Sequence, residues 1–177
     1  MKGRHMKYQL YRTKHGFTLI ELLIVIVIIG ILVTMGIFAF QSSQKKSRDA
    51  RRKEDLSQIS KALEMYNNDH EAYPNDSSGR IAGCESTFTS PCEWGSIFGN
   101  GSTVTYMIKL PKDPTSTWQY MYKQATKGYY LYARLENVQD VSVPADGNVY
   151  DVMCGAYNCN YVLTSPNTSE PAVISQP

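Results

Sequence analysis

An apolar run over residues 17–40 constrains this chain more than any other feature of its sequence. The run holds 24 residues, of which only Glu21 is charged and none is proline. As a helix it is about 36 Å long, which exceeds the roughly 30 Å hydrocarbon core of a bilayer. A cleaved secretory signal is shorter and ends at a small-residue site, and a helix that is apolar on every side is buried only in a large protein. We therefore predict that residues 17–40 form a transmembrane helix.

Glu21 is the one ionisable residue within this run. A charge inside the bilayer costs about 3 kcal/mol or more, so such a residue indicates a functional position. The alternative is that Glu21, which lies close to the start of the run, reaches the lipid headgroups.

Charge is distributed unevenly along the 177 residues. The net charge is +2, but residues 1–16 carry five basic side chains and no acidic one, whereas the chain beyond Lys53 carries 7 basic and 14 acidic side chains. An acidic surface repels nucleic acid, so we expect no nucleic-acid partner. Basic side chains flank the apolar run on both sides and leave its orientation in the membrane open.

The junction at residues 14–23, Lys-His-Gly-Phe-Thr-Leu-Ile-Glu-Leu-Leu, follows a short basic leader. It resembles the class III signal of type IV pilins and type II secretion pseudopilins. The resemblance implies cleavage after Gly16 by a prepilin peptidase on the cytoplasmic side, N-methylation of Phe17 and a structural role for Glu21 in assembly. Many pilins have a proline within the apolar helix; in this chain Phe38 stands where it often falls.

A helical pattern continues beyond the apolar run. Leu56, Ile59, Leu63 and Tyr66 recur at spacings of three and four, and no proline precedes Pro74. This spacing predicts one helix from residue 17 to about residue 68, ended before Tyr73-Pro74. We therefore expect a leader at 1–16, a transmembrane and filament-core half at 17–40, a half that packs on the head at 41–72, and a globular head at 73–177.

The head is predicted to be a small antiparallel sheet. Residues 75–105, rich in Gly, Ser, Thr and Asn, indicate a long loop. Aromatic residues at alternating positions in 118–124 and 129–136 predict a β-hairpin, with a third strand within 160–164 and a disordered tail from about residue 165. The fold class is thus α+β and pilin-like. The Leu-Pro-Lys-Asp-Pro segment at 110–114, followed by this hairpin, resembles the major pseudopilin of type II secretion more than the adhesive pilins.

Four cysteines form two close pairs, Cys84/Cys92 and Cys154/Cys159. Three connectivities are open, and we favour local pairing because it closes two loops rich in glycine and asparagine. The spacings are poor zinc patterns, and free thiols are the other alternative. Disulfides require an oxidising compartment, so they place the head outside the cytoplasm and the leader inside.

Asp146, Asn148 and Asp151 place oxygen ligands around a glycine turn. Related pseudopilins bind calcium in the head, so the resemblance implies a calcium site here, although Asp-Gly-Asn is also a common turn sequence. No other cofactor is expected. The sequence lacks the common hydrolase, metalloprotease and nucleotide-binding motifs, and catalysis is not expected.

We therefore expect a structural subunit of a pilus-like filament, foremost a type II secretion pseudopilin. The alternatives are a type IV pilus subunit (adhesion, motility, DNA uptake) and a membrane-anchored extracytoplasmic binding module. Expected partners are other copies of the chain, other pilins, the prepilin peptidase and the inner-membrane assembly platform. The expected location is the inner membrane, single-pass, with filaments in the periplasm or at the cell surface.

A basic run at residues 45–53 holds six basic side chains and one acid. It is expected to meet anionic lipid headgroups in the isolated subunit and the acidic heads of neighbouring subunits in a filament. The alternative is a solvated basic face.

Overall fold

The computed structural model describes residues 16–84, 90–100 and 104–175. The chain divides into two units, Met1–Ser42 and Ser43–Pro177. The first helix, α1 (Leu19–His70), begins in the first unit and ends in the second. The expected leader, apart from Gly16, lies outside the described residues.

Within the first unit, α1 presents apolar side chains on every side. Its described leucine, isoleucine and valine side chains are all at least about half exposed. This helix is long and apolar enough to cross a membrane by length and composition. The predicted span therefore forms a helix whose described apolar side chains stay exposed within its own unit.

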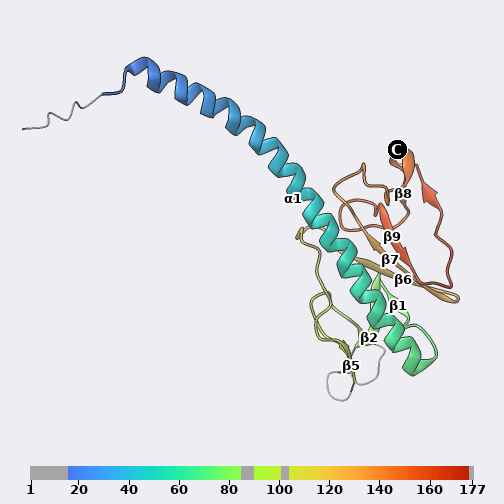
Figure 1. Ribbon diagram of the computed structural model, residues 1–177. Helices are drawn as coiled ribbons and strands as arrows, with labels where there is room; N and C mark the ends of the chain where they lie inside the picture. Colours follow the sequence, from blue (N-terminus) through green and yellow to red (C-terminus); the bar gives the residue numbers. More distant parts are fainter. Residues whose placement is uncertain (1–15, 85–89, 101–103, 176–177) are drawn as a thin grey trace, which may run out of the picture. The chain divides into compact units, whose positions relative to one another are not determined.

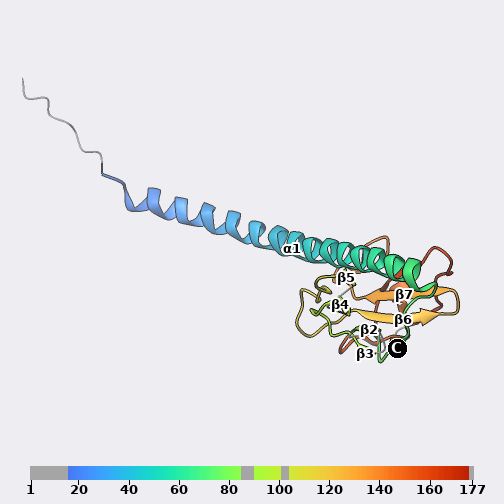
Figure 2. The ribbon, with the colours of Figure 1, turned by 90° about the horizontal axis from the view of Figure 1, so that it is seen from below.

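Within the second unit, α1 buries one face against the sheets (Figures 1 and 2). The predicted stripe of Leu56, Ile59, Leu63 and Tyr66 is buried in the main core. The helix ends at His70, and Glu71 takes a left-handed φ of 56°, just before Tyr73-Pro74. The stripe and the stop signal are thus confirmed.

A three-stranded antiparallel sheet lies against this face of α1. Its order is β6 (Met121–Ala125), β7 (Gly128–Ala133) and β9 (Tyr161–Thr164). Tyr122 pairs with Leu131 in the hairpin, and Leu131 pairs with Leu163 in the third strand. Tyr122, Tyr129 and Leu131 are fully buried in the same core as the α1 stripe. The predicted hairpin and third strand are therefore confirmed.

The segment expected to be a long loop, residues 75–105, instead contains most of a second sheet. Its strands are β1 (Asp76–Ser77), β2 (Arg80–Cys84), β3 (Ser90–Pro91), β4 (Phe98–Gly99) and β5 (Thr105–Met107). Phe98 is fully buried and stacks on Tyr66 of α1. The loop prediction was wrong because four of these strands have only two or three residues, and the five-residue β2 is buried along most of its length, so no alternating pattern is visible.

The C-terminal segment is ordered through residue 175, which corrects the expected disordered tail. A short 3-10 helix, Ala145–Gly147, leads into β8 (Val149–Tyr150), which pairs with β10 (Val173–Ile174). The Tyr150 hydroxyl donates to Glu170 at 2.6 Å, and Ser165 is buried. Contacts between side chains that are distant in sequence hold this polar segment in place. The composition of the segment alone therefore did not indicate that it is ordered.

Candidate functional site

The start of α1 forms a capping box between Thr18 and Glu21. The Thr18 amide and hydroxyl each donate to one Glu21 carboxylate oxygen at 2.8 Å, and the Glu21 amide donates to the Thr18 hydroxyl at 3.2 Å. A reciprocal pair of this kind satisfies amide groups that the first turn leaves unpaired. Glu21 therefore lies in the first turn of the helix with its carboxylate held by its own chain.

The expected processing junction precedes this cap and is accessible. Phe17 is 90% exposed, and no atom lies within 4 Å of the position that a Cβ on Gly16 would take. The structure thus brings Gly16, Phe17 and Glu21 within one turn of the helix start. The leader itself lies outside the described residues.

Both disulfides are the local ones, Cys84–Cys92 and Cys154–Cys159. All four cysteines of the chain are bonded, so none is available as a thiol or as a metal ligand. The first bond ties β2 to the start of the segment that leads to β4. The second closes a loop after β8 that packs against residues 117–119.

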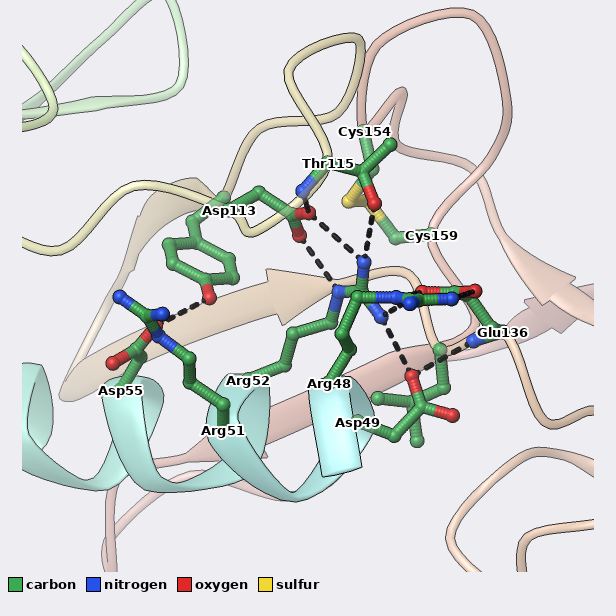
Figure 3. A network of polar contacts seen from close by, with 12 residues as sticks. Arg48, Asp49, Arg51, Arg52, Asp55, Asp113, Thr115, Glu136, Cys154 and Cys159 are labelled. Carbon is green, nitrogen blue, oxygen red and sulfur yellow. Dashed lines mark hydrogen bonds and ion pairs between the residues drawn. A yellow bond between two sulfur atoms is a disulfide. The ribbon is translucent and has the colours of Figure 1, made fainter. Parts of the chain in front are cut away.

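Arg52 is fully buried in the part of α1 that lies in the head. Its guanidinium makes a bidentate pair with Asp113 at 2.9 and 3.0 Å and donates to the Thr115 hydroxyl at 2.9 Å (Figure 3). Asp113 in turn accepts the Thr115 amide at 2.7 Å. Burial disfavours the Arg52 charge, but the hydrogen bonds and charges of its carboxylate partners outweigh it and raise the pKa of Arg52.

Asp49, one turn earlier and also buried, joins the same network (Figure 3). Its carboxylate accepts a hydrogen bond from Arg52 at 2.7 Å and from the amides of Glu136 and Asn137 at 2.9 and 2.8 Å. Glu136 pairs with Arg52 at 2.9 Å and with Arg48 at 2.5 and 2.6 Å. Two residues of α1 thus fix the segments at 113–115 and 136–137 to the helix.

This network corrects the interpretation of the basic run. Arg48 and Arg52 pair with Glu136, and Lys53 pairs with Asp140 at 2.6 Å. The expectation that the whole run faces lipid or neighbouring subunits was wrong, because four of its six cations form ion pairs within their own head. The sequence did contain a signal, since Asp49 and Arg52 extend the stripe of Leu56 and Ile59 at spacings of three and four.

Acid should weaken the head through Glu136. The hydrogen bond from Arg48 lowers the pKa of Glu136 from its usual 4.5 to about 2. A carboxyl whose pKa is depressed by folding contributes stability above its unfolded pKa, and that stability is lost as the pH falls through the folded pKa. We expect Glu136 to contribute up to about 3 kcal/mol near neutral pH, lost between about pH 4.5 and 2.

Urea unfolding of the full chain in detergent, from pH 7 to 2.5, measures this contribution. The difference in unfolding free energy between wild type and Glu136→Gln should shrink steadily as the pH falls below about 4.5. A difference that stays constant over this range would contradict the assignment.

The predicted calcium ligands lie around the turn before β8. Gly147 has a left-handed φ of 72°, and the Asn148 amide donates to the carbonyl of Ala145 at 3.2 Å. The side chain of Asp146 lies outside the described part of the chain. Among the described side chains, no group of three or more His, Cys, Asp and Glu residues converges as a metal site. Calcium binding at Asp146, Asn148 and Asp151 stays a prediction.

Comparison with known proteins gives matches along most of the chain. A model of the prokaryotic N-terminal methylation motif matches residues 11–37, and a model of type II secretion system protein G matches residues 39–136. The chain is 34% identical to the type II secretion system core protein G of Pseudomonas aeruginosa, over 69% of this chain and 83% of that protein. It is 30% identical to the corresponding protein of Aeromonas hydrophila, over 67% and 78%. No solved structure matches.

Proposed function

Because the chain belongs to the family of type II secretion system protein G, we propose that it is the main structural subunit of a secretion pseudopilus. Its role is structural, as in its family: the subunit polymerises rather than catalyses. The methylation motif at the junction implies processing by a prepilin peptidase and pilin-like assembly.

The observation that carries the proposal is the first half of α1. Its side chains are apolar on every side and exposed within their own unit, and the one charge, Glu21, stands next to the methylation junction. Such a surface is stable only in lipid or against other apolar helices. A helix that serves both environments is what a subunit needs when it leaves the membrane to join a filament.

The proposed role also suggests how the chain is oriented in the membrane and which partners it has. We propose a precursor with its leader in the cytoplasm, one span in the inner membrane and an extracytoplasmic head. The two disulfides support this orientation, because such bonds persist in oxidising compartments. Proposed partners are further copies of the chain, other pilins and the inner-membrane assembly platform. A type IV pilus subunit and an anchored binding module are the alternatives, and we see no feature in the described part of the head that favours either.

The proposal predicts cleavage between Gly16 and Phe17. Intact-mass measurement of the membrane protein should show a chain that begins with N-methylated Phe17 and lacks the 16-residue leader. Gly16→Leu should block the cut. The space beside the scissile bond is open in the wild type, and the leucine side chain would occupy it and hinder the approach of the peptidase. Gly30→Ala, which is also unobstructed but lies within the span, is the matched control and should be processed normally. An intact leader on the wild type in a host with an active prepilin peptidase would contradict the proposal.

A further inference from the structure

Arg134 lies directly after β7, and its guanidinium lies close to two aromatic rings. Its Cζ atom is 4.8 Å from the ring centre of Tyr157 and 5.7 Å from that of Trp118. One terminal nitrogen, Nη1, donates to the Asn158 carbonyl at 2.6 Å. The aromatic faces favour a cation at this position.

Within the described residues, Arg134 has no carboxylate partner. Arg48, Arg51, Arg52 and Arg80 each form an ion pair, whereas Arg134 forms none. Its Nε and Nη2 groups donate to no described residue. Two donor groups of the planar guanidinium are therefore available for a further acceptor. Burial lowers the pKa of Arg134, which is the sign of a charge that is partly removed from water without an opposite charge beside it.

The loop that carries Tyr157 is held rigidly. The Cys154–Cys159 bond closes it, and Gly155 bridges to Trp118 in an antiparallel contact. Gly155 has a φ of 102°, and a Cβ there would lie 2.3 Å from the Thr117 carbonyl oxygen, so only glycine allows this approach. Tyr157 is nevertheless 53% exposed. A fixed, half-exposed ring beside an unpaired guanidinium is a preorganised surface rather than part of the core.

We propose that Arg134, framed by Trp118 and Tyr157, binds a carboxylate of a second copy of this chain. The inference rests on the proposed function, which brings copies into contact. A carboxylate matches the planar donors of a guanidinium in a bidentate pair. The chain beyond Lys53 supplies such groups in excess, with 14 acidic against 7 basic side chains.

The candidate partners are exposed carboxylates that form no ion pair with a described residue. They include Glu54, Glu71 and Asp151. The protein G family model ends at residue 136, before the loop that holds Tyr157. Arg134 and Trp118 lie inside the matched region, 39–136, and Tyr157 lies beyond it.

The test uses the full chain expressed in a host that assembles it, and it measures the yield of sheared filaments. Arg134→Gln should lower the yield several-fold, and Arg134→Glu should lower it by about tenfold or more because like charges then meet. Lys127→Gln, the same charge change at an exposed lysine in the β6–β7 turn, is the matched control and should assemble normally. Non-reducing gels should show both disulfides in every variant, which verifies the fold.

Charge exchange identifies the second copy as the partner. Each of Glu54→Arg, Glu71→Arg and Asp151→Arg is added to the Arg134→Glu variant. The change at the true partner should restore the filament yield far better than the other two. Loss of filaments that none of the three relieves, or normal assembly of Arg134→Gln, would overturn the inference. If wild type itself forms no filaments, the proposed function fails instead.

Discussion

Replacing Arg52 by alanine should lower the free energy of unfolding by about 3–5 kcal/mol, the usual effect of removing one partner from a buried ion pair. Arg52 is completely buried and bonds to three carboxylates, of which Asp49 and Asp113 are themselves almost fully buried. Without the guanidinium, Asp49 and Asp113 have no cationic partner among the described residues, and Glu136 keeps only Arg48. We expect urea unfolding of the full chain in detergent to show the loss directly.

The neighbouring arginine provides the matched control. Arg51 is 67% exposed and lies 4.0 Å from Asp55, so Arg51→Ala should cost no more than about 1 kcal/mol. Arg52→Lys keeps the charge but not the flat fork, and it should fall between the two. If Arg52→Ala and Arg51→Ala have equal effects, the network does not stabilise the head.

Glu21→Ala should lower filament yield by about tenfold or more while leaving membrane insertion and processing intact. Removing the charge makes the span more apolar, so insertion should be easier. In an apolar filament core the carboxylate should pair with the cationic amine that cleavage creates on Phe17 of an adjacent subunit, and alanine cannot replace that contact.

Thr34→Ala is the matched control for this experiment. Thr34 is an uncharged polar residue within the span. Its hydroxyl donates to the Ile31 carbonyl at 2.7 Å within the same helix. Because this bond is local, the variant should assemble like wild type. Normal filament yield from Glu21→Ala would instead support the interpretation that Glu21 only reaches the headgroups.

Much of the fold follows from local patterns in the sequence. The apolar run, the stripe of Leu56, Ile59 and Leu63, and the alternating aromatics of the hairpin all have a period that matches one type of element. The two disulfides join nearest neighbours, as local pairing predicts. These features could be predicted because each depends on residues close together in the chain.

The features that sequence reasoning missed depend on residues that are distant in the chain. A run of basic residues usually lies in solvent, and the burial of Arg52 depends on partners such as Asp113, which is 61 residues away. The strands within residues 76–107 also depend on distant residues. A two-residue strand such as β4 forms only because the neighbouring strands supply its hydrogen-bond partners. The ordered tail likewise depends on Tyr150 and Glu170.

The pairing of the cysteines has a consequence for export of the head. Their separations along the chain are only 8 and 5 residues, and each bond joins a cysteine to the next cysteine along the chain. A head that crosses the membrane from its N-terminal side, as the proposed orientation requires, would expose its cysteines to the oxidant in the order in which they pair. Under the proposed export, consecutive oxidation would yield the native bonds, and we expect maturation of this subunit to need no enzyme that reshuffles disulfides.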